Sequence, residues 1–367
     1  MNKIKILHIQ LLPILSGVQN VMLQILLGLD KNKYEIFVLS APDGPLVDKV
    51  TQLGYQHIGM KSLRRELSVK DIIVFWDLYK IIKRYKFDIV HTHSSKTGFL
   101  GRIAAKLAGT KKIVHTVHGF PFHQFQPKIV QKVYQTAEKI AGLFCDNLVF
   151  VNNTDRDFAI RTGLISKSKA VTIYNGIDSH NVSRQNILQS DIITVGCVCR
   201  FWEQKNVIDT IKTAIKVCSE TDIINFVFVG DGEHLSLCEE MVKEAVLEDR
   251  IKLPGWQSDA YLWLKKFDVF LLYSKWEGLP ISILEAMSIG LPIVASDING
   301  NNELVTKENG FLVSIYNIDK LFEVLTNLPN QKERLTEMGK KSLEIAQGKF
   351  GLDRFIKSYL ELYEEEI

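Results

Sequence analysis

The segment EGLPISILEAM at residues 277–287 carries the clearest structural signal in this chain, together with the GLP that follows at 290–292. A proline at the fourth position of the segment favours the start of a helix, where a missing N–H costs nothing, and the later glycine favours its end. We therefore predict a helix over 281–288, with Glu277 in the preceding loop and Glu285 on the second turn. One carboxylate then lies before the positive end of the helix, and the other lies just inside it.

These two carboxylates have a functional and a structural interpretation. The backbone N–H groups of Gly278 and Leu279 lie where the helix begins, which is a ready site for an anion such as a phosphate. A nearby carboxylate, Glu277 or Glu285, accepts hydrogen bonds from two hydroxyls of a sugar or a ribose. Alternatively, both only complement the helix dipole, which is worth ~0.3–1 kcal/mol each. The spacing alone leaves both interpretations open.

Outward from this segment, short apolar runs alternate with amphipathic stretches along the whole sequence, which is typical of parallel sheets covered by helices on both faces. Strands are predicted at 4–9, 36–39, 88–91, 112–117, 147–151, 192–198, 225–229, 250–252, 269–272 and 292–295. Helices are predicted at 18–29, 69–85, 101–108, 129–141, 207–219, 260–266, 281–288 and 350–366.

We therefore predict the α/β class, with two Rossmann-like doubly wound domains at 1–180 and 190–345. The polar stretch 178–191 is the predicted linker. A C-terminal helix within 350–367 is expected to pack back toward the first domain. Because ligands of such sheets bind beyond the carboxyl ends of the strands, a cleft between the two domains is the expected site.

Composition supports two folded domains in a reducing compartment. Of the 367 residues, 46% are apolar and 24% are charged, so both domains can bury a core. Five cysteines form an odd set without a Cys-x-x-Cys pair, as expected of reduced thiols. No apolar run approaches the ~18 residues of a membrane span. We expect a cytoplasmic protein, either free or peripheral on the inner face of the cell membrane.

Charge is divided unevenly along the chain. Residues 1–180 carry 25 Lys and Arg against 13 Asp and Glu, whereas residues 181–367 carry 20 against 29. A basic half favours an anionic partner such as a membrane, a lipid diphosphate or a nucleic acid, although solvated lysine-rich helices are an alternative. We predict no nucleic-acid partner, because the sequence has no helix-turn-helix, zinc-finger spacing or aromatic RNA-binding motif.

The predicted helix 69–85 places Phe75, Trp76 and Tyr79 among basic residues, which favours contact with an anionic membrane. Alternatively, these rings pack into the core of the domain. The basic residues in question are Lys61, Arg64, Arg65, Lys80, Lys83, Arg84, Lys86, Lys111 and Lys112.

Four further candidates lie near predicted strand ends. Arg200 and Lys205 follow a strand, so both can reach a diphosphate, although solvated side chains are the usual fate of such residues. Gly17 follows the first strand and permits close approach of the backbone to a ligand, or is an ordinary loop glycine. His118, after strand 112–117, is suited to hydrogen-bond a substrate, although a lone histidine is more often only a satisfied polar residue.

Histidines in the first half raise the question of a metal site. Their spacing fits no standard zinc pattern, they lack carboxylate or cysteine companions, and an Asp-x-Asp clamp is also missing. We therefore expect neither a metal nor another cofactor. The histidines are His91, His93, His115, His118 and His123.

The segment 277–287 resembles the Glu-x7-Glu motif of family 4 glycosyltransferases with the GT-B fold, and the resemblance extends over nearly the whole chain. This chain has Ser16-Gly17 where the family often has Gly-Gly, which leaves the shape of that loop open. The other matching motifs are Ser16-Gly17-Val18, His91-Thr92-His93-Ser94 with Gly98 to Gly109, Thr116-Val117-His118-Gly119-Phe120, Asn175-Gly176-Ile177-Asp178, Arg200 with Lys205, Gly230-Asp231-Gly232, Ser296 to Glu303, and Asn309-Gly310-Phe311-Leu312-Val313.

The resemblance implies a retaining glycosyltransferase that uses a nucleotide-sugar donor, first of all a UDP-sugar, and no metal. The transferred group is expected to be a hexose or N-acetylhexosamine, and the acceptor a polyprenyl-diphosphate-linked sugar of a bacterial capsule or O-antigen. His118 and Glu277 are then the catalytic candidates. The donor-binding candidates are Gly17, Arg200, Lys205, Gly278, Leu279 and Glu285.

Three alternatives remain at this point. A nucleotide-sugar epimerase or hydrolase of the same fold would use the same donor without a glycan acceptor. A non-enzymatic binding module is disfavoured by the intact charged motifs. A nicotinamide-dependent oxidoreductase ranks last, because the first predicted strand is not followed by Gly-x-Gly-x-x-Gly.

Overall fold

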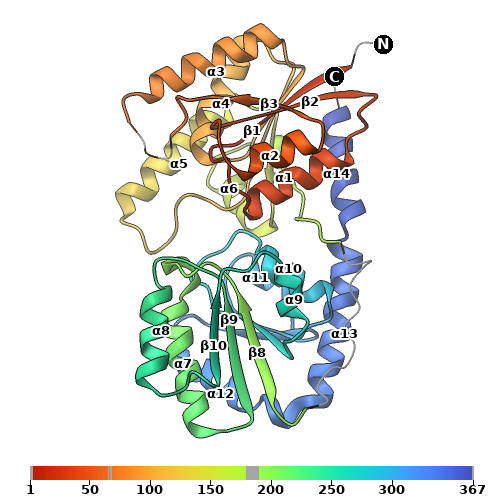
Figure 1. The fold of residues 1–367 in the computed structure, drawn as a ribbon. Helices are drawn as coiled ribbons and strands as arrows, with labels where there is room; N and C mark the ends of the chain where they lie inside the picture. The colour runs from red at the N-terminus through yellow and green to blue at the C-terminus, as the bar shows by residue number, and fades with distance from the viewer. Residues whose placement is uncertain (1–2, 65, 67, 179–189, 366–367) are drawn as a thin grey trace. The chain divides into compact units, whose positions relative to one another are not determined.

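The computed structural model describes residues 3–64, 66, 68–178 and 190–365. The chain forms two α/β units, and Figure 1 shows both. Residues 1–176 and 352–367 form the first unit, and residues 177–351 form the second. The first unit is therefore discontinuous in sequence, because the last helix returns to it. The predicted boundary at 180 and most of the predicted linker lie outside the described residues.

The first unit is built on a parallel sheet of seven strands in the order β3-β2-β1-β4-β5-β6-β7. Strand β1 lies between β2 and β4, with Ile6 opposite Ile36 and Ile89. The strand order reverses between β1 and β4, so the carboxyl ends of these two strands mark the topological switch point of the sheet. The strands are β1 (Ile4–Ile9), β2 (Tyr34–Ser40), β3 (Gln56–Gly59), β4 (Ile89–Thr92), β5 (Lys112–Val117), β6 (Asn147–Phe150) and β7 (Ala170–Thr172).

Helices cover both faces of this sheet. They are α1 (Gly17–Gly28), α2 (Pro45–Gln52), α3 (Asp71–Tyr85), α4 (Ser95–Ala108), α5 (Lys128–Gly142), α6 (Asn153–Arg161), the 3-10 turn η1 (Lys167–Lys169) and α14 (Leu352–Glu364). Helix α3 packs along α4, and α1 packs along α14 (Figure 1). Close contact with α14 requires glycine at position 28, since a Cβ there would lie 2.3 Å from the side chain of Ile356.

The two faces of the first sheet differ in polarity. Along β1 the side chains alternate, so Leu7 and Ile9 join an apolar core with α3 and α4. His8 belongs to the opposite face, where its ring contacts those of His91 and Tyr363 of α14. The apolar face stabilises the unit by burial, and the polar face collects histidines under the C-terminal helix.

The second unit contains a parallel sheet of six strands in the order β10-β9-β8-β11-β12-β13. Its strands are β8 (Ile193–Val198), β9 (Ile224–Val229), β10 (Ile251–Gly255), β11 (Val269–Leu272), β12 (Ile293–Ser296) and β13 (Gly310–Val313). Its helices and 3-10 turns are η2 (Glu203–Lys205), α7 (Val207–Glu220), α8 (Leu235–Glu244), α9 (Ala260–Leu264), α10 (Ile281–Ser288), α11 (Asn301–Leu304), α12 (Ile318–Thr326), η3 (Leu328–Gln331) and α13 (Lys332–Lys349).

The predicted α/β class with two doubly wound parallel sheets is confirmed. Each predicted strand and helix is present, although α4 begins six residues before the predicted 101–108. Three strands were not predicted: β3, β7 and β13. All three are edge strands of three or four residues with partly exposed side chains, so their local pattern is weak. Within the described residues, no helix is both long and apolar enough to span a membrane.

Candidate functional site

The loop after β8 carries Arg200 and Lys205 and is tied to the loop after β9. Phe201 of the first loop is fully buried, and its N–H donates to the carbonyl of Asp231 in the second loop at 2.9 Å. Gly230 permits this approach, because its φ is 145° and a Cβ there would lie 1.8 Å from a carbonyl oxygen of the β8 loop. The Gly-Asp-Gly motif therefore serves to hold two loops together at the carboxyl edge of the sheet.

Lys205 forms a buried ion pair with Glu277, which lies in the loop after β11. The Nζ and Oε1 atoms are 2.5 Å apart, and the side chains are only 16% and 7% exposed. Burial alone lowers the pKa of Lys205, but the Glu277 carboxylate outweighs it and raises the pKa above its ordinary value. Lys205 is therefore charged at neutral pH. The amide of Gln204 supports the pair by donating to the carbonyl of Trp276 at 2.9 Å.

Backbone contacts fix the loop that carries Glu277. Gly300 has φ of 83°, and a Cβ at this position would lie 2.0 Å from the carbonyl oxygen of Gly278. The hydroxyl of Ser296 also donates to the carbonyl of Ser274 at 2.6 Å. The loops after β11 and β12 are thus locked to each other, so the position of Glu277 is set by two strands.

Helix α10 follows this loop. Pro280 is its N-cap rather than part of its first turn, so Gly278 and Leu279 lie directly before the helix. Glu285 lies within α10, as predicted, and burial raises its pKa to about 7. Its carboxyl group is therefore balanced between the neutral and charged forms near neutral pH, and a hydrogen-bond donor would favour the charged form.

Arg200 is the exposed member of the second unit's candidate residues. Its guanidinium lies 4.7 Å from the centroid of the Trp202 ring, a distance typical of a cation–π contact. Stacking of this kind limits the rotamers of a long side chain. The structure thus brings Lys205 and Glu277 together and places Arg200 on the same loop at the surface.

In the first unit, His118 is half-buried directly after β5. Its Nε2 lies 3.2 Å from Nδ1 of His93, and Nε2 of His93 lies 2.9 Å from Nδ1 of His8. His8 and His93 are almost fully buried. Burial lowers the pKa of His8 to about 3 and that of His118 to about 4, so these rings are neutral at pH 7.

The ring of His91 contacts those of His8 and His93 in a tilted arrangement and is hydrogen-bonded on both sides. Its ring centroid lies 4.1 Å from that of His93. Its Nδ1 lies 2.6 Å from the hydroxyl of Tyr363, and its Nε2 lies 2.8 Å from the hydroxyl of Thr116. Thr116 in turn lies 3.0 Å from the hydroxyl of Tyr359. Two tyrosines of α14 therefore anchor the histidine cluster.

The remaining predicted histidines lie elsewhere. His115 is hydrogen-bonded to Thr92 at 2.8 Å and packs against Gly98 of α4, on the apolar side of the sheet. His123 lies in the loop before α5 and is half-buried. Sequence reasoning missed His8, although a histidine inside the largely apolar run 4–9 was a signal that could have found it.

Ring nitrogens of His8, His91 and His93 all lie within 4.8 Å of one another, a spacing that a metal ion could bridge. However, both nitrogens of His91 already meet hydroxyls, and both nitrogens of His93 meet other histidines. Among the ring nitrogens of these three histidines, only Nε2 of His8 is buried without a hydrogen-bond partner within the described residues. The contacts therefore fit a hydrogen-bond network better than a metal site, and the absence of a metal remains a prediction.

Gly17 is the first residue of α1 and follows the N-cap Ser16, whose hydroxyl contacts the amide of Gln19. The glycine is exposed, and it is not among the described glycines with a left-handed backbone. Glycine is thus not required here for conformation; its effect is to leave the backbone at the start of the helix uncovered.

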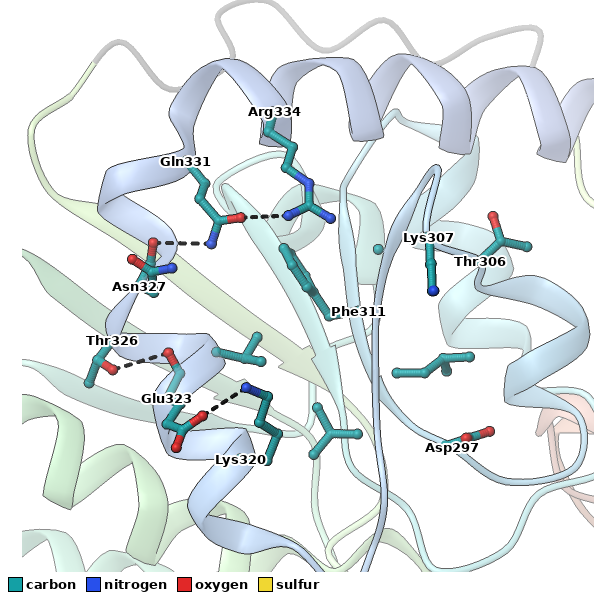
Figure 2. Close-up of a pocket in the computed structure, with 14 residues that line it drawn as sticks. Asp297, Thr306, Lys307, Phe311, Lys320, Glu323, Thr326, Asn327, Gln331 and Arg334 are labelled. Carbon is teal, nitrogen blue, oxygen red and sulfur yellow. Dashed lines mark hydrogen bonds and ion pairs between the residues drawn. The ribbon is translucent and has the colours of Figure 1, made fainter.

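A separate pocket of about 790 Å³ lies along the edge strand β13 and helix α12 (Figure 2). In it the Arg334 guanidinium lies 5.0 Å from the ring centroid of Phe311. Lys320, also in the lining, is paired with Glu323 at 2.8 Å. None of the eight predicted site residues lines this pocket.

Two family models cover most of the chain. Residues 15–181 match the model described as Glycosyltransferase Family 4. Residues 178–344 match the model described as Glycosyl transferases group 1.

Similar proteins agree with these matches. An Escherichia coli UDP-Gal:alpha-D-GlcNAc-diphosphoundecaprenol alpha-1,3-galactosyltransferase is 40% identical, covering 90% of this chain and 89% of that protein. A Campylobacter jejuni N,N'-diacetylbacillosaminyl-diphospho-undecaprenol alpha-1,3-N-acetylgalactosaminyltransferase is 24% identical over 96% of both chains. Among solved structures, Anabaena HepE in complex with UDP and glucose has a TM-score of 0.83 at 17% identity, covering 98% of this chain and 99% of that chain, which shows a common fold.

Proposed function

Since this chain belongs to glycosyltransferase family 4, we propose that it transfers a hexose or N-acetylhexosamine from a UDP-sugar to a polyprenyl-diphosphate-linked sugar, with retention of configuration. The name of the 40%-identical relative makes UDP-galactose and an α-GlcNAc-diphospho lipid the first substrates to test. Both curated relatives are named for alpha linkages, which supports retention because UDP-hexoses are themselves α-linked. Such an acceptor suits synthesis of a bacterial capsule or O-antigen.

The buried Lys205–Glu277 pair is the observation that carries this proposal. During transfer, the bond from the sugar C1 to the β-phosphate oxygen breaks, and an acceptor hydroxyl oxygen bonds to C1 on the same face. The acceptor proton passes to the departing phosphate, so no separate nucleophile is needed. Negative charge develops on UDP in this step, and Lys205 with Arg200 stabilises it.

The two carboxylates take different parts of the donor. Glu277, beside Lys205, accepts hydrogen bonds from hydroxyls of the transferred sugar. Glu285 accepts hydrogen bonds from the two ribose hydroxyls, and these O–H donors favour the charged carboxylate against the effect of burial. Gly278 and Leu279 place backbone N–H groups before α10, where a helix end attracts phosphate.

For the first unit, we propose that His118 hydrogen-bonds the transferred sugar. Gly17 leaves the start of α1 uncovered, which suits close approach of a phosphate oxygen to the backbone. No metal is required in this scheme, because cationic side chains and helix ends stabilise the diphosphate.

The test is a screen of nucleotide-sugars with a synthetic GlcNAc-diphospho lipid, measuring UDP release with and without the acceptor. We expect release from UDP-galactose only when the lipid is present, and an α-linked disaccharide by the C1 proton coupling. Equal release without acceptor would instead support a hydrolase of the same fold, and conversion of the UDP-sugar into another UDP-sugar without acceptor would support an epimerase. A β-linked product would exclude retention.

We also propose that the first unit contacts an anionic membrane. Phe75 and Tyr79 pack partly against the core, as in the alternative interpretation, but Trp76 is 51% exposed. Helix α5 adds a surface that the sequence did not single out, with Ile129 75% exposed and Val133 64% exposed. The exposed basic residues of α5 are Lys128, Lys132 and Lys139.

The charges of α5 favour this partner. Its one acidic residue, Glu138, is buried and paired with Arg102, so lysines alone accompany the exposed apolar side chains. Lysines near an anionic bilayer contribute ~1 kcal/mol each, and apolar side chains add insertion. Among the basic residues predicted for this contact, Arg65 lies outside the described residues.

Co-sedimentation with vesicles tests this contact. We expect binding to phosphatidylglycerol vesicles at low salt and not to phosphatidylcholine vesicles, and strong weakening by Ile129→Glu with Val133→Glu. Leu262→Glu, at an exposed leucine of the second unit, is the matched control and should bind normally. No binding to anionic vesicles by the unchanged protein would exclude the membrane contact and leave the transferase proposal standing.

A further inference from the structure

Three histidines form a continuous hydrogen-bonded chain that ends at His118. The links run from Nδ1 of His8 to Nε2 of His93 at 2.9 Å, and from Nδ1 of His93 to Nε2 of His118 at 3.2 Å. The first two rings are 0% and 3% exposed, and the third is half-buried. The rings of His8 and His93 contact other imidazoles and the ring of Tyr363, and these neighbours are uncharged at neutral pH.

A neutral imidazole has one N–H and one lone pair, so such a chain has only two possible directions. In the first, His8 donates from Nδ1, His93 donates from Nδ1, and His118 accepts at Nε2 and carries its own proton on Nδ1. In the second, His118 donates from Nε2 and every proton moves to the other nitrogen of its ring.

The inner end of the chain distinguishes the two directions. Nε2 of His8 is buried and has no hydrogen-bond partner within the described residues. In the second direction that atom would carry an N–H, and unpaired buried N–H groups are rarer than unpaired acceptors. In the first direction the same atom is only a lone pair, so the first direction is favoured.

We propose that His8 and His93 are positioning residues that fix His118 as the Nδ1–H tautomer, so that His118 offers its substrate an N–H donor and not a lone pair. This rests on the proposed contact of His118 with the transferred sugar. It specifies the chemistry of that contact: the sugar atom facing His118 must accept a hydrogen bond, as a hydroxyl oxygen does.

The direct test is nitrogen NMR of the full-length protein labelled with 15N-histidine, which separates protonated from bare ring nitrogens. Signals of His118 are assigned by their loss in His118→Gln. We expect His118 to be protonated at Nδ1 and bare at Nε2. Protonation at Nε2 would overturn the proposal. Because this measurement needs no substrate, it stands or fails independently of the transferase proposal.

Two substitutions at position 8 test the direction of control. His8→Leu removes the first donor, so His118 should become a mixture of tautomers, and kcat should fall about tenfold with little change in the KM for the donor. His8→Asn keeps an N–H near the position of Nδ1, so it should restore most of the Nδ1–H tautomer of His118 and most of kcat. His57→Leu is the control. It removes a half-buried histidine that contacts Ser40 and does not belong to the row of hydrogen-bonded histidines, so the His118 tautomer should be unchanged.

Sugar analogues provide a second readout. A donor with fluorine in place of the contacted hydroxyl can still accept a hydrogen bond but cannot donate one, whereas the deoxy donor can do neither. We expect the fluoro donor to be used faster than the deoxy donor at one ring position, and the difference to vanish in His118→Ala. Equal rates at every position would contradict donation by His118. An unfolded His8→Leu variant would leave the NMR and analogue tests decisive.

Discussion

The two units differ in whether the side chains that their motifs bring together are neutral or charged. In the first unit, a chain of buried imidazoles reaches His118, and burial keeps these rings neutral. In the second unit, Lys205 and Glu277 form an ion pair and Lys205 remains charged. A neutral chain can orient one hydrogen bond but responds little to charge, whereas an ion pair can exchange a partner for a charged ligand. The second unit is therefore suited to a diphosphate, and the first to an uncharged sugar.

One buried ion pair in the first unit offers the strongest test of this contrast. Arg102 of α4 is 0% exposed and contacts Glu138 of α5 at 2.8 Å, on the apolar side of the sheet. Arg102→Leu should lower the free energy of unfolding by about 3–5 kcal/mol, because Glu138 is left buried and unpaired. Urea unfolding measures this effect. Arg102→Leu with Glu138→Leu should recover most of the loss.

The control for this pair is Lys340→Ala, which breaks a surface ion pair with Glu337. It should change stability by at most about 0.5 kcal/mol. A full-sized loss in the Arg102–Glu138 double variant would mean that the pair itself, and not the unpaired charge, stabilises the first unit. The first unit would then also depend on an ion pair for its stability, and only its histidine face would differ from the charged second unit.

Removing the charge of the second unit should have the next largest effect. Lys205→Ala is expected to reduce kcat/KM about 10²–10³-fold, because the charge that develops on the diphosphate goes uncompensated. Arg200→Ala should reduce it in the same direction. Lys320→Ala breaks an exposed pair with Glu323 and serves as the control, with normal turnover. Near-normal turnover in both Lys205→Ala and Arg200→Ala would refute the assignment of the diphosphate to this loop.

Glu285 provides a smaller, pH-dependent effect. Its folded pKa of about 7 lies above the ordinary value of 4.5, so the free protein holds a proton there below pH 7 and loses stability as the pH rises through 7. Ribose hydroxyls favour the charged form, so UDP affinity should rise about tenfold from pH 6 to pH 8. Calorimetry at both values measures this change.

Glu285→Gln should bind UDP weakly and without pH dependence. Glu277→Gln should retain the pH dependence and lose turnover instead, because it faces the transferred sugar. Equal weakening of UDP by both variants would contradict this division between ribose and sugar.

The smallest effect is expected from chelators. If His8, His91 and His93 form only a hydrogen-bond network, EDTA should leave both turnover and the melting temperature unchanged. Loss of activity that Zn²⁺ or another divalent ion restores would make this cluster a metal site. The contrast with the charged second unit would then be reversed.

Sequence patterns predicted most of this fold because buried parallel strands are mostly apolar. The run 269–272, Val-Phe-Leu-Leu, coincides with β11, all of whose residues are buried. The edge strand β3 escaped prediction because its four residues are all partly or fully exposed, so its conformation comes from pairing with β2. Exposed edges are determined by tertiary contacts that a local pattern does not record.

The candidate site shows the same limit. Glu277 and Glu285 were visible because their spacing and the glycines around them are local. The contact between His91 and Tyr363 joins residues 272 positions apart, and no periodicity within either segment points to it. Long-range polar partners of this kind had to come from the three-dimensional structure.

The return of α14 to the first unit affects the order in which the nascent chain can fold. Synthesis from the N-terminus completes residues 177–351 before it reaches Leu352–Glu364, so the second unit has all of its strands while the first still lacks its last helix. Domains commonly fold in the order in which they leave the ribosome. Here the earlier-made unit must wait until residues 352–364 have been made before Tyr359 and Tyr363 can cover its histidines. Termination between residues 351 and 359 would release a chain whose second unit is whole and whose first unit lacks the two tyrosines that cover its polar face.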